Sequence, residues 1–430
     1  MRAGSAGIGY TGRMHSRLPL ALLLLASISF PSAFAQQRKL LVISVDGMDS
    51  RYLHDADRLG LKIPVLRRLM AEGTTAQGVV GVVPTVTWPS HTTIISGVPP
   101  EEHGILTNDQ PGRPGQRWWF THFLKAPVLW QIAKERGLKT AAIYWPVTVG
   151  ATVDFNFPEF WVTRTEHEIQ FAPIAERATP GLVDKVAKVY PSFKRESWDD
   201  EAAMLALRYL LEFEQPDFTL IHIADLDSEA HEKGAFTPAA HKVLENQDRL
   251  IGHALEKLPR NTLVAIVSDH GFENIEKVIR PNVMLKSAGV AAEAAVSNGL
   301  IGVKDARAAA WFRGLAKDSA SGIAREVPIA EVRRMAPRIK DWLAAFEPSS
   351  GYAASAASDG PAVSEGDRTG THGMWPTRAH YRASFLIWGP GVRKGKLGEI
   401  SMLELGPTFA SILGLELKAA KMPSLWPKLH

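Results

Sequence analysis

Three aspartates and three histidines, in four short segments, have the side chains that bind divalent metal ions. The segments are spread between positions 46 and 372, and each alone is more typical of an ordinary turn or helix start. Together, three carboxylates and three imidazoles make a ligand set that suits two zinc-like ions. The candidate metal ligands are Asp46, Asp227, His231, Asp269, His270 and His372.

A segment between the first two ligand segments could supply an oxygen nucleophile. Thr85 and Thr87 both lie in residues 84–91, just before a predicted helix. A threonine hydroxyl is a poor nucleophile at neutral pH, but a metal ion lowers the pKa of an oxygen that it binds. A helix beginning here would also favour binding of an anionic phosphoryl group. The combination indicates a phosphoryl-transfer hydrolase.

Apolar runs that alternate with helical segments predict an α/β fold with a mostly parallel central sheet flanked by helices. Asp46, Asp227 and Asp269 each follow a predicted strand closely, and ligands of open α/β sheets bind beyond the carboxyl ends of the strands. The predicted strands are 40–45, 140–144, 218–224, 262–268 and 383–388, and the predicted helices are 64–70, 128–136 and 200–213.

Residues 274–370 differ from their surroundings and are predicted to form a smaller inserted cap beside the site. The stretch is rich in alanine, with helical segments expected at 305–315 and 329–346 and a mobile segment at 349–360. His372 follows it directly. We find no internal repeat with the period of a solenoid.

The N-terminal segment predicts export. Arg13 and Arg17 precede an apolar stretch at 18–30, which leads to an Ala-Phe-Ala sequence ending at Ala35. This is the pattern of a cleaved signal peptide, and the apolar stretch is shorter than the ~20 residues of a membrane span. We therefore expect cleavage after Ala35, leaving 36–430 as one catalytic domain, periplasmic or secreted and without a membrane span.

Charge and cysteine content narrow the functional classes further. The chain has 49 Lys and Arg against 45 Asp and Glu, and without residues 1–35 the basic count falls to 46, a net charge of +1. This gives no reason to expect nucleic-acid binding. The chain has no cysteine, so an exported form must rely on its core rather than on disulfides, and a zinc site must use His and carboxylate ligands.

In order and type, these segments resemble the motifs of the nucleotide pyrophosphatase/phosphodiesterase family of the alkaline phosphatase superfamily, in the form of an exported bacterial member. The family patterns are P-T-x-T-F-P-N-H, G-I-x-x-N, D-S-x-G-H, S-D-H-G-M and G-x-H-G-Y. Departures from them are Ser90 for Asn, Ala230 for Gly, and residues 147–149 for a small acidic run, which puts substrate contacts there in doubt. The similar segments are 84–91, 104–108, 227–231, 268–272 and 370–374, within a resemblance from about 39 to 415.

The resemblance implies roles for the site residues. Thr87, rather than Thr85, is then the nucleophile and becomes a phosphothreonine. Asn108 donates a hydrogen bond to a non-bridging oxygen. Trp88, in place of the usual Phe, stacks on a nucleoside of the substrate. One zinc is held by Asp46, Thr87, Asp269 and His270, and the other by Asp227, His231 and His372.

The implied activity is hydrolysis of phosphodiester or pyrophosphate bonds in small nucleotide-like substrates. The same site would also suit a phosphomonoesterase, a phosphonate hydrolase or a lipid-headgroup phosphodiesterase. A metal-stabilised protein without catalysis is the non-enzymatic alternative. A sulfatase is disfavoured, because sulfatases mature a Cys or Ser to an aldehyde, whereas this chain has no Cys and Thr87 cannot be converted in that way.

Overall fold

The computed structural model describes residues 9, 12, 38–162, 164, 165, 168–367 and 369–430. The chain divides into two units, 1–36 and 37–430, and the architecture below belongs to the second. The predicted signal peptide lies almost wholly outside the described residues. Within the described part of the chain, no helix is long and apolar enough to cross a membrane.

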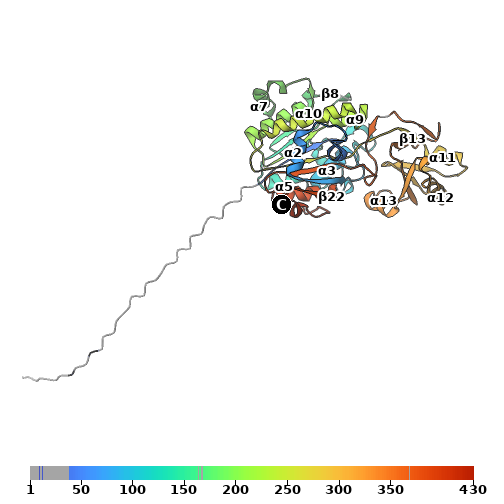
Figure 1. The fold of residues 1–430 in the computed structure, drawn as a ribbon. Helices are drawn as coiled ribbons and strands as arrows, with labels where there is room; N and C mark the ends of the chain where they lie inside the picture. The colour runs from blue at the N-terminus through green and yellow to red at the C-terminus, as the bar shows by residue number, and fades with distance from the viewer. Residues whose placement is uncertain (1–8, 10–11, 13–37, 163, 166–167, 368) are drawn as a thin grey trace, which may run out of the picture. The chain divides into compact units, whose positions relative to one another are not determined.

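Eight strands form the central sheet, in the order β22–β2–β21–β11–β1–β10–β5–β6 (Figure 1). Only β21 runs against the others, so the expected α/β fold with a mostly parallel sheet is confirmed. The strands are β1 (Lys39–Val45), β2 (Thr74–Val80), β5 (Thr140–Ile143), β6 (Phe155–Phe157), β10 (Phe218–Ile223), β11 (Thr262–Val267), β21 (Phe385–Trp388) and β22 (Gly395–Ser401).

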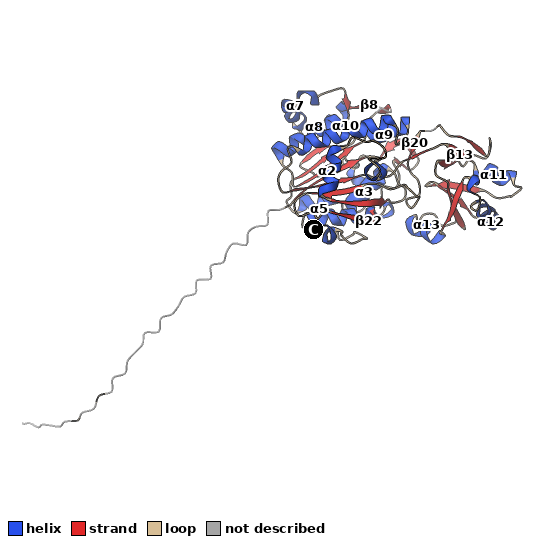
Figure 2. Cartoon of the chain, in the orientation of Figure 1, coloured by secondary structure: helices blue, strands red, loops and turns tan. Residues whose placement is uncertain are grey.

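Helices cover both faces of this sheet (Figure 2). Alternate residues of β1 enter two separate cores: Leu41 and Ile43 pack on one side, Leu40 and Val42 on the other. This explains the unbroken apolar runs, because a strand buried on both faces has no polar side. The first core also contains α2 (Pro64–Glu72), α8 (Asp200–Tyr209) and α10 (Pro238–Leu255); the second contains α3 (Thr87–Ser96), α5 (Leu129–Glu135) and α14 (Leu405–Ile412).

The segment predicted to be a cap has its own small sheets and core. Its two ends pair with each other through β12 (Glu273–Asn274) and β20 (Gly370–Thr371). Phe312 and Phe346 stack in its core, with ring centroids 5.2 Å apart. That this segment is an insertion stays a prediction. Its main antiparallel sheet has the order β14 (Ala294–Ser297), β15 (Leu300–Val303), β17 (Ala344–Pro348), β16 (Ile323–Val327), and α12 (Ala306–Leu315) packs on it.

One helix prediction in this segment is wrong. The helix expected at 329–346 ends at Met335 as α13 (Ile329–Met335), and the chain continues into the buried strand β17. Pro337 explains the break, because proline has no N–H to donate and disfavours helical backbone at the residue before it. The neighbouring segment expected to be mobile contains the short strand β18 (Tyr352–Ala354), which pairs with β13 (Lys277–Ile279).

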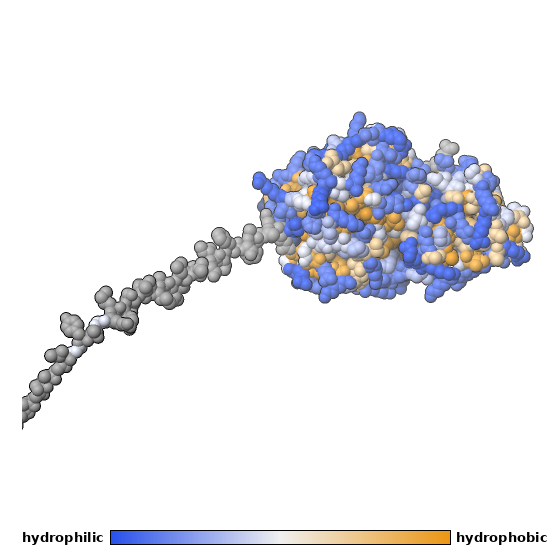
Figure 3. All heavy atoms as spheres, turned by 60° about the horizontal axis from the view of Figure 1, so that its bottom comes forward, coloured by the Kyte–Doolittle hydropathy of each residue, from blue (hydrophilic) through white to orange (hydrophobic). Residues whose placement is uncertain are grey.

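Hydrophilic residues cover most of the face shown in Figure 3, with smaller hydrophobic areas between them. Large apolar side chains that are exposed include Phe120, Val162 and Phe213. Some exposed apolar side chains are normal on a folded protein.

Candidate active site

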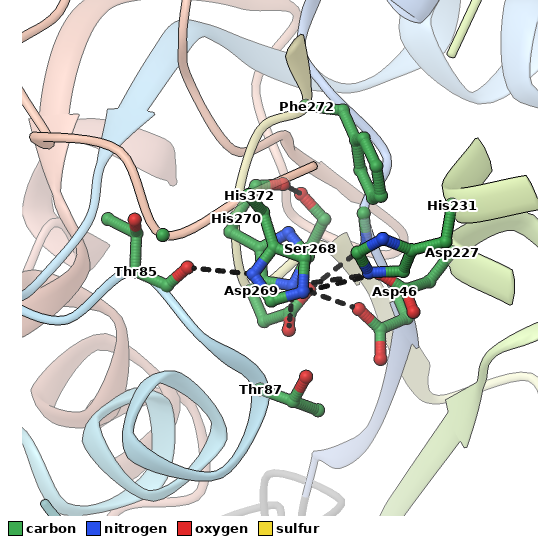
Figure 4. Close-up of polar contacts among 12 residues, drawn as sticks. Asp46, Thr85, Thr87, Asp227, His231, Ser268, Asp269, His270, Phe272 and His372 are labelled. Atoms are coloured by element: carbon green, nitrogen blue, oxygen red, sulfur yellow. Dashed lines mark hydrogen bonds and ion pairs between the residues drawn. The ribbon is translucent and has the colours of Figure 1, made fainter. Parts of the chain in front are cut away.

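The six predicted metal ligands converge at the carboxyl ends of three neighbouring strands (Figure 4). The adjacent strands β11, β1 and β10 deliver five of them, as expected for an open parallel sheet. The sixth ligand follows the C-terminal end of the cap segment. Asp46 follows β1, Asp269 and His270 follow β11, Asp227 and His231 lie on α9 (Asp225–Lys233) after β10, and His372 follows β20.

Asp227 lies at the centre of the cluster. Its Oδ1 atom is 3.5 Å from Nε2 of His231, 3.9 Å from Nε2 of His270 and 3.8 Å from Nε2 of His372. Because Asp227 and His231 are four residues apart on α9, their side chains lie on one face of that helix. Asp227, His231 and His372 can therefore hold one ion, since their ligand atoms all lie within 4.8 Å of one another.

A second group of ligand atoms, from Asp46, Asp227 and His270, meets the same distance limit. His270 Nε2 lies 3.3 Å from Asp46 Oδ1 and 3.2 Å from Asp269 Oδ2. Asp269 is held by its other oxygen, which accepts the Gly47 N–H at 3.1 Å. The structure thus brings Asp46, Asp269 and His270 together as the resemblance implies, and it places Asp227 between the two groups.

All three imidazoles present the same nitrogen to the cluster. Each Nδ1 atom faces a backbone carbonyl: His231 faces Gly370 at 3.1 Å, His270 faces Gly271 at 3.2 Å, and His372 faces Thr85 at 3.2 Å. A carbonyl oxygen only accepts, so the proton lies on Nδ1 and Nε2 keeps its lone pair. Rings held in this way turn Nε2 inward, where it can bind a metal ion.

Several buried acceptor atoms in the cluster have no hydrogen-bond partner. They are Asp46 Oδ1, Asp227 Oδ1, Asp269 Oδ2 and His270 Nε2. Burial, with the charges of Asp269 and Asp227, raises the pKa of Asp46 well above its usual value, and burial with nearby His372 lowers the pKa of His270. Buried acceptors without a donor are costly. Divalent cations would satisfy all of them, so these residues fit a metal centre.

Thr87 borders this cluster. It is the first residue of α3, and its hydroxyl is turned toward the carboxylates and imidazoles (Figure 4). With Asp46 and His372 it lines a cavity of about 110 Å³. Asn108 lines the same cavity, and its Oδ1 accepts the Trp88 N–H at 3.1 Å. The amide NH₂ of Asn108 is therefore its donor group, as an oxyanion-binding role requires.

The competing hydroxyl of Thr85 is used elsewhere. Thr85 is 1 % exposed; its Oγ1 donates to Met374 O at 2.7 Å and accepts from the Tyr381 hydroxyl at 3.0 Å. A hydroxyl held by two protein partners cannot reach a substrate without breaking both bonds. The geometry therefore favours Thr87 as the nucleophile.

Trp88 is more deeply buried than expected for a side chain that stacks on a nucleoside. It is 2 % exposed and meets Trp119 and Trp161 edge-on, each at a centroid distance of 5.6 Å. The guanidinium of Arg117 lies 5.1 Å from its ring centroid. Trp88 still lines the cavity, but most of its surface packs against protein, so stacking on a nucleoside stays a prediction.

Two histidines beneath the ligands had no role assigned from the sequence. His222 Nε2 lies 2.9 Å from Asp46 Oδ2, and its Nδ1 lies 3.1 Å from Tyr144 O. His91 Nδ1 lies 2.9 Å from Thr87 O. One signal was available for His222, because it interrupts the otherwise apolar strand β10. Both histidines support residues of the site from below.

This fold and site together define the alkaline phosphatase superfamily: a mostly parallel sheet whose central strands bring carboxylates and imidazoles to one edge, next to a hydroxyl. Within that class the family is also clear. Residues 40–375 match the model of the type I phosphodiesterase / nucleotide pyrophosphatase family, and the chain belongs to this family.

Named relatives agree with this assignment. The venom phosphodiesterase of Macrovipera lebetinus is 27% identical over 265 residues, which cover 57% of this chain and 27% of that protein. Ectonucleotide pyrophosphatase/phosphodiesterase family member 1 of Homo sapiens is 27% identical over 250 residues, covering 54% and 23%. The match thus spans about a quarter of the length of these relatives.

Solved structures share the fold over nearly the whole chain. Murine ectonucleotide pyrophosphatase/phosphodiesterase 5 superposes with a TM-score of 0.60 at 19% identity, covering 91% of this chain and 98% of that one. The human protein of the same name gives a TM-score of 0.59 at 18% identity, covering 90% and 98%. At this level of identity the likeness concerns the fold.

Proposed function

We propose that the chain hydrolyses phosphodiester or pyrophosphate bonds of small nucleotide-like substrates at a site that binds two zinc ions. The observation that carries this proposal is the set of buried, unpartnered atoms of Asp46, Asp227, Asp269 and His270 beside the hydroxyl of Thr87. The names of the relatives support the reaction class. A solved structure of murine ectonucleotide pyrophosphatase/phosphodiesterase 5, in an inactive threonine-to-alanine form, contains AMP.

The ligand residues form two groups, and each group would hold one zinc ion. When bound, zinc supplies positive charge that lowers the pKa of the hydroxyl and neutralises charge on the phosphoryl oxygens. Zinc is favoured by the mixture of imidazole and carboxylate ligands. One ion is assigned to Asp227, His231 and His372, whose ligand atoms lie close together. The resemblance implies Asp46, Thr87, Asp269 and His270 for the other, and His270 lies near both aspartates.

Thr87 carries the covalent chemistry in this proposal. Its hydroxyl gives up its proton to water, its Oγ1 attacks phosphorus as the bond from phosphorus to the leaving oxygen breaks, and the leaving group departs with the electron pair and takes up a proton from water. Water then attacks the phosphothreonine and restores the hydroxyl. The amino end of α3 and the amide of Asn108 bind the non-bridging oxygens, which carry the negative charge during both steps.

The charge of the cavity favours diesters over monoesters. Arg117 is the one Lys or Arg among the described residues that line it, and its guanidinium is already paired with Asp109 at 2.8 Å. A terminal phosphate carries an additional negative charge and needs more positive partners. A phosphodiester carries a single charge, which the site as described can match more easily.

Hydrolysis of bis-p-nitrophenyl phosphate and p-nitrophenyl phosphate, by metal-stripped and zinc-reloaded protein, tests the proposal. We expect zinc-dependent turnover with a preference for the diester. Preference for the monoester would assign the protein to the phosphatases with the same site. Full zinc occupancy without turnover of either ester would refute the proposed catalysis. Export is tested separately. If the signal peptide is cleaved after Ala35, the periplasmic or secreted protein should begin at Gln36.

A further inference from the structure

Hydrogen bonds join the segment that precedes the nucleophile to the turn that carries His372. The carbonyl oxygen of Thr85 accepts the Gly373 N–H at 3.1 Å and lies 3.2 Å from His372 Nδ1. Thr85 thereby sets the orientation of the His372 ring, although it is two residues from Thr87 and far from His372 in sequence. The position of this one carbonyl affects both the nucleophile and a metal ligand.

The side chain of Thr85 is fixed by Tyr381. Met374 O can only accept, so the Thr85 hydroxyl donates to it, at 2.7 Å, and must itself accept from the Tyr381 hydroxyl, at 3.0 Å. The Gly373 N–H also points to the Tyr381 oxygen at 3.1 Å. Tyr381 is 3 % exposed. This chain of hydroxyls has one possible direction, from Tyr381 through Thr85 to Met374.

We propose that Tyr381 is a positioning residue for the metal centre: its hydroxyl holds Thr85, and Thr85 holds His372 in the orientation that binds zinc. The proposal rests on the two-zinc site of the proposed function. Tyr381 is not among the described residues that line the cavity with Thr87, and its hydroxyl is bonded to Thr85 Oγ1 and to the Gly373 N–H. Without this hydroxyl, the buried Thr85 Oγ1 would lose the donor described above, which is costly in a buried place.

The expected size of the effect follows from the place of Tyr381 in the chain of contacts. Replacing a partner that directly orients a metal ligand typically weakens metal binding about 10–100-fold. Tyr381 acts on His372 indirectly, through Thr85. In a variant without the tyrosine hydroxyl, the Gly373 N–H would still donate to Thr85 O. We therefore expect a loss at the lower end of this range, about tenfold, for the ion held by Asp227, His231 and His372.

The test is zinc affinity of the full chain, measured by competition with a chromophoric chelator. Tyr381→Phe should bind one of the two ions about tenfold more weakly and the other normally. Thr85→Val, which keeps the shape but removes the hydroxyl, should have the same effect. The double variant should lose less affinity than the two single losses combined, since both single variants remove the Tyr381–Thr85 bond. Thr85→Ser keeps the hydroxyl and should bind zinc like the natural chain.

Tyr52→Phe is the matched control. Tyr52 is also a buried tyrosine, and its hydroxyl accepts one backbone N–H, from Phe236 at 2.8 Å. Normal zinc affinity in Tyr381→Phe, or an equal loss in Tyr52→Phe, would overturn the inference. If the natural chain binds two zinc ions but hydrolyses no phosphate ester, the proposed function fails and this inference still stands. If the natural chain binds no zinc, both fail.

Discussion

Replacing His222 with leucine should weaken zinc binding, because His222 fixes the carboxylate of Asp46. Nε2 of His222 is hydrogen-bonded to Asp46 Oδ2 at 2.9 Å, and this bond leaves Asp46 Oδ1 turned toward His270. Both side chains are buried. Leucine fills much of the space of the ring but has no donor, so Asp46 Oδ2 would lose this bond and the carboxylate could rotate.

The magnitude can be worked out from the type of bond. A hydrogen bond to a charged group contributes about 1.5–3 kcal/mol, and every 1.4 kcal/mol corresponds to about a tenfold change in affinity. The predicted loss is therefore about ten- to hundredfold, which equals the range usually found for partners of metal ligands. Asp46 belongs to the group with His270, so only one of the two ions should be affected.

Chelator competition measures the two affinities, and thermal unfolding shows whether the variant is folded. His222→Gln retains an N–H donor and should recover part of the affinity. His103→Gln removes another buried histidine, which contacts Thr93 rather than the ligands, and should bind zinc normally. Unchanged zinc affinity in His222→Leu, or a loss in His103→Gln as large as in His222→Leu, would refute the reasoning.

Three further predictions concern the nucleophile, the metal and acid stability. Thr87→Ala should still bind zinc but lose hydrolysis by several orders of magnitude, whereas Thr92→Ala, whose hydroxyl donates to Trp88 O in the same helix, should remain active; equal rates would contradict the assigned nucleophile. Chelation should lower the melting temperature, because the buried carboxylates then repel one another without a cation; calorimetry that shows no recovery on adding zinc would contradict this. Burial lowers the pKa of His103 from 6.5 to about 3. The unfolded chain therefore takes up this proton first, and stability present at pH 7 is lost as the pH falls below 6.5. His103→Gln should reduce the loss of unfolding free energy between pH 7 and pH 5 by about 2 kcal/mol, and identical pH profiles for the two proteins would disprove the assignment.

The sequence predicted strands correctly where both faces of a strand are buried. The runs at 40–45, 218–224 and 262–268 predict β1, β10 and β11 because each strand is covered on both faces and has no polar side. The candidate ligands followed from these strands, since parallel strands end at one edge. The resemblance added the choice of Thr87 and the division of the ligands between two ions, which periodicity alone does not supply.

Other features depend on tertiary contacts that no local pattern records. An apolar run carries no direction, so the antiparallel course of β21 between β2 and β11 could not be predicted. The helix expected at 329–346 is a mixed case: Pro337 was a local signal for its end, whereas the strand β17 that follows is buried by its sheet neighbours, which override local helical spacing. The partners of Thr85 lie 289 and 296 residues away in the sequence, beyond the reach of any spacing argument.

The position of β21 has a consequence for how the chain is made. Strand β2 reaches the centre of the sheet only through β21, and its other neighbour is β22. Both partners lie more than 300 residues beyond β2. At a synthesis rate of about 5–20 residues per second, β2 waits on the order of 15–60 s for its partners to be synthesised. An early strand with unpaired edges can pair wrongly during that time, so we expect a nascent chain that stops before residue 385 to need a chaperone, and the complete sheet to form only after β22 has been synthesised.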